Sequence, residues 1–275
     1  MPNFIVGARL HDYGKGTPDE LFGKVSADGF AAVQLAYKKC VPTVKSYADV
    51  TDALVAETVA AEKAHHIQVA VLGTYVELAI NDESRLSNVA DFKSQLAVCK
   101  ALGAGCIGTE TTAMSKQPTG TTRTQAQELL CRSLAEILPA AEALGVTVGI
   151  EPVTYHSMNS AAATRHILDT MRSPNLKVIF DMCNLVSAEN VDAQDRIWYD
   201  MGALLGDQIV AVHFKGQAFA PDGSLLHTSL EESRTDYAGA FAMLRQLPQP
   251  ALPVLREEAV PARAASDIAF MKGFF

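Results

Sequence analysis

Four side chains that can bind a metal or move a proton lie at the ends of short apolar runs. Glu151 closes "VTVGIE", Asp181 closes "LKVIFD", His213 lies in "IVAVHF" and Glu257 lies in "PVLREE". Each run has the length and content of a buried strand. Taken alone, any one of these residues is typical of a helix cap or a satisfied core histidine. Four of them at equivalent places on successive strands indicate a shared site.

Three carboxylates packed together repel one another and resist ionisation, and a divalent cation relieves that repulsion. Carboxylate oxygens and one imidazole are ligands that suit Mn²⁺, Mg²⁺, Co²⁺ or Zn²⁺. No cysteine stands among the four residues, which disfavours a structural zinc site. We therefore expect one divalent metal ion, held by Glu151, Asp181, His213 and Glu257.

The elements that must position these residues alternate between short apolar runs and longer amphipathic ones. The expected strands span residues 3–10, 31–37, 67–73, 104–110, 146–151, 176–181, 209–214 and 253–258. Helical patterns separate them, and such alternation is typical of a parallel sheet. From His11 to Glu257 the chain covers 257 − 11 = 246 residues, about 35 for each of seven units, which suits a (β/α)8 TIM barrel.

The predicted fold class is therefore α/β, with residues 1–275 forming a single (β/α)8 barrel domain. An open doubly wound sheet is the alternative. That fold usually carries a glycine-rich phosphate loop after its first strand, and "GARLHDYGKG" fits neither GxGxxG nor the P-loop spacing. In a barrel, the carboxyl ends of all eight strands face one mouth, where catalytic residues collect.

The last strand offers two registers, because side chains alternate between inside and outside. If Leu255 and Glu257 point inward, Arg256 and Glu258 point towards the helices. The opposite register would bury a guanidinium just below a divalent cation, at a cost of several kcal/mol. We predict that Glu257, and not Glu258, faces the site.

Other polar residues around the expected mouth are candidates for substrate binding. Lys215 follows His213 by two residues and so points to the same side, where it could hold a substrate oxygen or stabilise an oxyanion. The alternative is a lysine at the rim in water. The full set of substrate-binding candidates is Lys215, His156, Asn184, Tyr75, Glu110 and His11.

The segments "GIEP", "SPNLKVIFDMCNL", "VHFKG" and "PVLREE" resemble the xylose isomerase-like barrels, and the resemblance covers nearly the whole chain. This family includes ketose 3-epimerases, hydroxypyruvate isomerases, inosose dehydratases and isomerases, and type IV endonucleases. The resemblance implies a metal bound by Glu151, Asp181, His213 and Glu257. It also implies that Glu151 and Glu257 are the catalytic pair that transfers a proton on either side of the substrate.

Two positions depart from the pattern of that family. Asn184 follows the strand-six aspartate at the place where the epimerases commonly have a histidine, and Gln34 stands where a glutamate is frequent. Both departures bear on the contacts with substrate and on the reaction.

The leading functional hypothesis is a metal-dependent isomerase or epimerase of a small sugar, keto-sugar or polyol, which works through an enediolate. The alternative is a lyase on the same site, performing inosose-type dehydration or cleavage of an oxidised glycoside. An abasic-site endonuclease would need a basic DNA groove and more histidines, and the chain has a net charge of −8 and seven histidines. A non-catalytic ligand-binding barrel would be indicated by a lost ligand position, and none of the four is lost.

Composition predicts the cellular compartment of the protein and the kind of partner it binds. The five cysteines are scattered without a CxxC pair, which favours reduced thiols and a cytoplasmic protein. No apolar run approaches the about 20 residues of a membrane span, and none suggests a signal peptide. We expect a small carbohydrate as the partner, with no nucleic acid and no membrane. A homo-oligomer is possible, or a hetero-oligomer if the protein is a glycoside-cleaving lyase.

Overall fold

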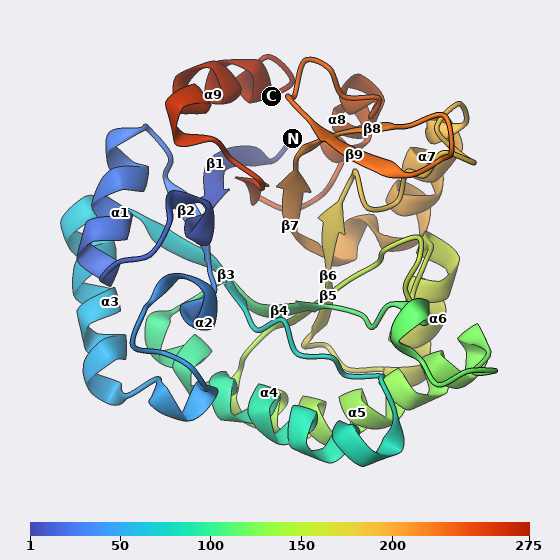
Figure 1. Cartoon of the computed structure of the whole chain (residues 1–275), viewed down its shortest axis with the longest axis horizontal. Helices are drawn as coiled ribbons and strands as arrows, with labels where there is room; N and C mark the ends of the chain where they lie inside the picture. The colour runs from blue at the N-terminus through green and yellow to red at the C-terminus, as the bar shows by residue number, and fades with distance from the viewer.

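The computed structural model describes all residues, 1–275, and shows a closed barrel of eight parallel strands with helices around it (Figure 1). The barrel strands are β1 (Asn3–Arg9), β2 (Ala32–Leu35), β3 (Gln68–Gly73), β4 (Cys106–Glu110), β5 (Val148–Glu151), β6 (Leu176–Asp181), β7 (Ile209–Phe214) and β10 (Ala251–Arg256). The longer helices are α1 (Pro18–Ala27), α3 (Asp52–His65), α4 (Asp82–Leu102), α5 (Arg123–Leu144), α6 (Ala161–Met171), α7 (Gln194–Leu205), α8 (Tyr237–Leu244) and α9 (Ala264–Lys272). The short α2 (Tyr37–Cys40) follows β2.

The predicted (β/α)8 barrel is confirmed, and the open doubly wound sheet is wrong. Strand β1 pairs with β2 on one side and with β10 on the other, so the sheet has no free edge. The last strand spans Ala251–Arg256 and not 253–258, so Glu257 and Glu258 are the first residues after it. None of the helices is long and apolar enough to cross a bilayer.

Local sequence signals set the ends of several helices. Thr17 caps α1 in a reciprocal capping box with Glu20, and Pro18 occupies the first helical position. Helices α4 and α5 end at Gly103 and Gly145, whose left-handed φ angles of 66° and 69° suit a residue without a side chain. The two glycines end α4 and α5 a few residues before the chain continues into the barrel strands β4 and β5.

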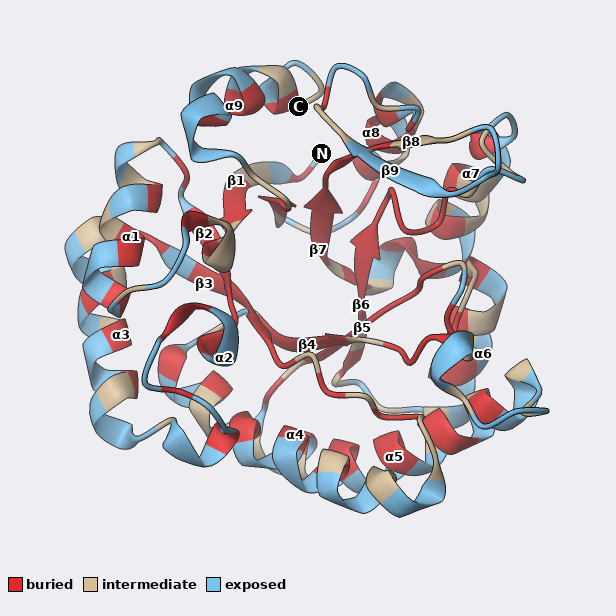
Figure 2. Cartoon of the chain, viewed as in Figure 1, coloured by how far each residue is buried: buried red, intermediate tan, exposed pale blue.

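The inside of the barrel is filled by a small apolar cluster below the mouth, which consists of Ala32, Ala70, Val71, Cys106, Ile179, Ala211 and Leu255. Gly108 and Gly149 leave room for Ile179, since a Cβ at either glycine would lie 2.5 or 2.8 Å from an Ile179 side-chain atom. The larger apolar core lies between the strands and the helices, whose outer faces are exposed (Figure 2). The polar site therefore rests on a packed apolar floor.

A hairpin of β8 (Gly216–Phe219) and β9 (Leu225–Thr228) follows β7 and lies outside the barrel (Figure 1). Strand β9 is largely exposed (Figure 2). Lys215 is the single residue between β7 and this hairpin, so both elements fix its backbone.

The outward side of β10 carries a buried ion pair. Arg256 Nε lies 2.8 Å from Asp267 Oδ2 of α9, and both residues are at most 3% exposed. Arg256 also donates a hydrogen bond to the backbone carbonyl of Glu257. Leu255 meanwhile lies in the barrel interior, so β10 has the orientation that the alternation argument predicts.

We expect Asp267→Ala to lower the free energy of unfolding by about 3–5 kcal/mol, because it leaves a buried guanidinium without its partner. Urea unfolding followed by circular dichroism measures this loss. Glu231→Ala is the matched control, since it removes the exposed pair with Arg263 and should change the free energy of unfolding by less than about 1 kcal/mol. Equal effects of the two variants would contradict the prediction.

Candidate metal centre and substrate pocket

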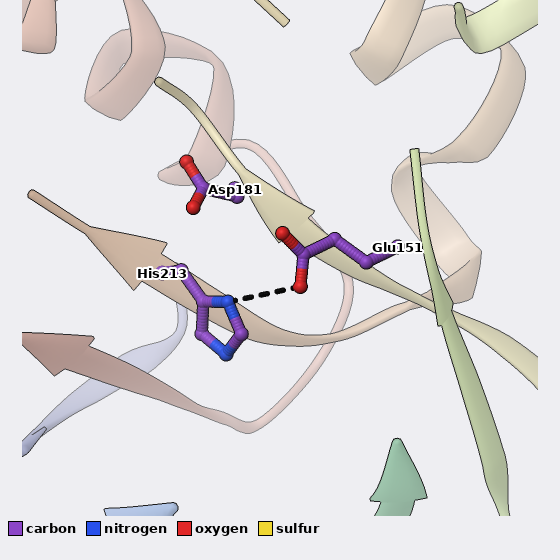
Figure 3. A group of neighbouring side chains, drawn as sticks. All are labelled: Glu151, Asp181 and His213. Carbon is purple, nitrogen blue, oxygen red and sulfur yellow. Dashed lines mark ion pairs between the residues drawn. The ribbon is translucent and has the colours of Figure 1, made fainter. Parts of the chain in front are cut away.

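Three metal-ligating side chains converge at the carboxyl ends of neighbouring strands. Glu151 ends β5, Asp181 ends β6 and His213 is the penultimate residue of β7. One ligand atom from each lies within 4.8 Å of the others, and all three residues are buried. Figure 3 shows the three side chains pointing toward one another, with His213 Nδ1 3.1 Å from Glu151 Oε2.

Glu257 joins this group from the opposite side of His213. Its Oε1 lies 3.5 Å from His213 Nδ1, and the residue is 5% exposed. It lies outside the tightest group of three. The structure thus brings together the four residues that the sequence singles out as metal ligands.

One polar atom at this point is buried without any partner. Asp181 Oδ1 accepts hydrogen bonds from the backbone N–H groups of Cys183 and Asn184, which fixes the carboxylate. Asp181 Oδ2 and His213 Nδ1 each have an ion-pair partner, whereas His213 Nε2 makes neither a hydrogen bond nor an ion pair. A buried nitrogen without a partner is rare in protein interiors, and a bound cation would satisfy it. The donor set, oxygen from carboxylates and nitrogen from imidazole, fits a divalent metal ion.

Lys215 is part of the cluster. Its side chain is 9% exposed, and its Nζ lies 2.8 Å from Asp181 Oδ2 and 3.6 Å from Glu257 Oε2. Burial alone would lower the pKa of Lys215, but Asp181, Glu257 and Glu151 outweigh it and raise that pKa well above its usual value. The alternative of a rim lysine in water is therefore wrong.

Arg9, at the end of β1, is a site residue that the sequence reasoning missed. Its Nη1 lies 3.8 Å from Glu257 Oε2, and its Nη2 pairs with Asp12. The available signal was a charged residue at the carboxyl end of an apolar run, the same signal that identified Glu151. Lys215 pairs with Asp181 and Glu257, and Arg9, which also pairs with Asp12, lies beside Glu257. A divalent cation is therefore not the only means of relieving their repulsion, and that step of the sequence argument is corrected.

The two glutamates have opposite electrostatic environments. Burial raises the pKa of Glu151, although His213 opposes this effect. Burial acts in the same direction on Glu257, but His213, Lys215 and Arg9 outweigh it and lower the pKa of Glu257 to about 2. Two carboxylates whose pKa values are pushed apart are suited to acid and base roles.

The two departures from the family pattern make specific contacts. Asn184 Nδ2 donates a hydrogen bond of 2.6 Å to Glu151 Oε1, so a neutral amide orients this carboxylate. Gln34 Nε2 donates to the hydroxyl of Tyr75 at 2.9 Å. Both residues therefore position groups of the site.

The remaining candidates lie farther out. Tyr75 and Glu110 line the pocket together with the metal-ligating residues. His11 lies in the short helix after β1 and packs its ring edge against Tyr75, with centroids 5.8 Å apart. His156 is not beside the four: its Nε2 lies 3.9 Å from Glu110 Oε2, and burial lowers its pKa to about 4.

Two cavities that share lining residues lie at the barrel mouth. The inner pocket, of about 20 Å³, is lined by Gln34, Val71, Gly73, Tyr75, Gly108, Thr109, Glu110, Glu151, Ile179, His213 and Glu257. The outer cleft, of about 460 Å³, is lined by Lys39, Tyr75, Val76, Glu77, Thr109, Glu110, Thr111, Ala113, Ser115, Lys116, Tyr155 and His156. Tyr75, Thr109 and Glu110 belong to both, so the outer cleft adjoins the pocket that Glu151, His213 and Glu257 line.

Comparison with protein families gives one match, to the xylose isomerase-like TIM barrel, over residues 22–273. A comparison with curated protein sequences finds no match.

Solved structures share the fold at low sequence identity. A D-tagatose 3-epimerase-like protein has a TM-score of 0.77 at 13% identity, with 100% of this chain and 97% of that chain covered. The IOLI protein with a bound zinc atom has a TM-score of 0.75 at 15% identity, with 100% and 96% covered. The 3-keto-D-glucoside 4-epimerase YcjR of E. coli has a TM-score of 0.73 at 17% identity, with 98% and 100% covered.

Proposed function

Because the chain belongs to the xylose isomerase-like TIM barrel family, we propose that it is a divalent-metal-dependent isomerase or epimerase of a small sugar, keto-sugar or polyol. The observation that carries this proposal is the placement of Glu151 and Glu257. Both have a carboxylate oxygen within 3.5 Å of His213 Nδ1, and both line the inner pocket. Two such carboxylates at the floor of one pocket can remove a proton and return it.

The proposed chemistry is proton transfer at a carbon next to a carbonyl. A bound divalent ion, held by Glu151, Asp181, His213 and Glu257, would polarise the carbonyl and acidify the neighbouring C–H. One glutamate then removes the proton and the other returns it, through an enediolate of the substrate.

Neighbouring residues prepare these two carboxylates. Asn184 orients Glu151 by its hydrogen bond, and Arg9 and Lys215 favour the ionised form of Glu257. The ammonium of Lys215 also lies where it can donate to a substrate oxygen that gains negative charge.

The names of similar structures support the class of substrate and the metal. One of them is named as a sugar epimerase and another as an epimerase-like protein, and a third holds zinc. Manganese, magnesium, cobalt and zinc all remain suited to the donor set. All five cysteines are free thiols, which supports our proposal of a cytoplasmic location.

A lyase on the same site is the second candidate, and Asn184 is the observation that favours it. A neutral amide touches Glu151 at the position where the epimerases commonly have a histidine. Loss of the same proton also permits β-elimination, so product analysis separates the two reactions. An endonuclease is disfavoured by the net charge of −8, which gives no basic groove for DNA.

Deuterium exchange tests the proposed reaction directly. We expect the protein, supplied with Mn²⁺ in D₂O, to incorporate deuterium from solvent next to the carbonyl of at least one ketose, detected by NMR. Glu151→Gln should abolish this incorporation, because an amide cannot accept the proton. Absence of exchange in a panel of ketoses, inososes and 3-keto-glucosides would overturn the proposed proton transfer.

A further inference from the structure

The inner pocket admits only a small part of a substrate. Its volume of about 20 Å³ is close to the 10–15 Å³ that one water molecule requires. The outer cleft, at about 460 Å³, falls within the roughly 300–1,000 Å³ of pockets that bind drug-sized ligands. The reacting carbons of a sugar would lie at the inner pocket beside Glu151 and Glu257, and any group attached to that sugar would extend past Tyr75 and Glu110 into the outer cleft.

The rim of the outer cleft carries an exposed aromatic ring on a rigid backbone. Tyr155 is 56% exposed, although it follows β5 by only four residues. Its carbonyl accepts a hydrogen bond from Met114 N–H, and the next residue, His156, forms a β-bridge with Ala113. Arg123 donates a hydrogen bond to the carbonyl of His156 as well. The loops after β4 and β5 thus hold each other.

The Tyr155 ring itself is braced from one side. It packs edge-on against the ring of His156, with centroids 4.7 Å apart, and His156 is 5% exposed. An aromatic face that is exposed but pre-positioned offers a stacking surface with little loss of conformational freedom on binding.

The outer cleft carries few unpaired charges. Lys116 pairs with Glu77, and the Lys39 ammonium lies over the Tyr75 ring, 3.2 Å from its centroid. Burial raises the pKa of Glu110 to about 8, so this carboxyl group is largely neutral near pH 7. Lys39 is then the one unpaired cation among the four charged residues that line the cleft, which therefore lacks the cluster of cations that recognises a phosphate or a carboxylate.

From the size, the aromatic rim and the low charge of the cleft together, we propose that the outer cleft is a second subsite, for an uncharged ring linked to the reacting sugar. The substrate would then be a two-ring glycoside that carries a carbonyl on its reacting sugar, and not a free monosaccharide or a sugar phosphate. The second ring stacks on Tyr155, and its linkage passes between Tyr75 and Glu110. This inference rests on the proposed sugar chemistry and deepens it.

Equilibrium binding measured by calorimetry tests the subsite without requiring turnover. The probes are methyl β-D-glucopyranoside, phenyl β-D-glucopyranoside, cellobiose and glucose 6-phosphate, each titrated into the full-length protein with Mn²⁺. We expect the phenyl glucoside and cellobiose to bind about 2- to 10-fold more tightly than the methyl glucoside, from the stacking contribution of one aromatic ring. A stronger gain for the phenyl compound identifies an aryl group as the second ring, and a stronger gain for cellobiose identifies a sugar.

Three variants locate the effect. Tyr155→Ala should abolish the preference for two rings, whereas Tyr155→Phe keeps the ring and should retain it. Tyr199→Ala is the matched control, because Tyr199 is an exposed tyrosine of α7 that lines neither cavity and should leave the preference intact. Thermal unfolding of each variant verifies that the fold persists.

The outcomes separate this inference from the proposed reaction. Equal affinities for one and two rings, tighter binding of glucose 6-phosphate, or no binding of any probe would overturn the subsite. A two-ring preference that depends on Tyr155, found in a protein without deuterium exchange, would support the subsite and refute the proposed reaction. Deuterium exchange into ketoses by a protein that shows no preference for two rings would support the proposed reaction and refute the subsite.

Discussion

Glu257→Gln is expected to lower kcat/KM in the exchange assay by at least about 10²- to 10⁴-fold, the contribution of a general acid or base. The amide cannot accept a proton, and it is a weaker metal ligand than the carboxylate. The fold should persist, because Arg256 holds the backbone of this segment through the carbonyl of Glu257 and through Asp267. Circular dichroism and thermal unfolding verify the fold of the variant.

Glu258→Gln is the matched control for this prediction. Glu258 is the next residue, has a left-handed φ of 56° and points away to pair with His227, 2.5 Å from its Nδ1. It contacts none of the residues of the cluster, so the variant should retain most of the activity. If Glu258→Gln were inactive and Glu257→Gln active, the assignment of Glu257 as the site residue would be wrong.

Removal of divalent metal is expected to abolish turnover without unfolding the protein. Activity should fall to background after exhaustive chelation and return on addition of Mn²⁺, Mg²⁺, Co²⁺ or Zn²⁺, with the most active ion identifying the preferred metal. The fold should survive, since Lys215 pairs with Asp181 and Glu257, and Arg9 and His213 lie beside Glu257 as well. We therefore expect one bound metal by elemental analysis and a chelated protein that still unfolds cooperatively.

Direct metal binding gives a readout independent of activity. Mn²⁺ titrated into the chelated protein should bind at one site, and His213→Gln should weaken that binding strongly. Asp200→Asn is the matched control. Asp200 is a carboxylate of α7 that pairs with Arg196 and lines neither cavity, so this variant should bind Mn²⁺ as the unmodified protein does. Full turnover after chelation, or Mn²⁺ binding that is unaffected by His213→Gln, would contradict the proposed centre.

Much of the fold can be predicted from sequence because its determinants are local. Apolar runs of four to seven residues alternate with capped helices, and Gly103 and Gly145 mark helix ends through their left-handed conformation. Residues at the carboxyl ends of parallel strands must face the same end of a barrel. The sequence therefore predicts that Glu151, Asp181 and His213 lie close together, and alternation along the last strand distinguishes Glu257 from Glu258.

The tertiary structure alone decides which segments that are far apart in the chain come into contact. The interior position of Lys215, the pairing of Arg9 with Glu257 and the hydrogen bond from Asn184 to Glu151 join different strands and loops. The outer cleft likewise exists because the loop after β4 bonds to the loop after β5 at Ala113 and His156. Alternation within a strand is a property of a few adjacent residues, so it can be read from them. The distance between two loops depends on how the whole barrel closes, and no short stretch of sequence contains that information.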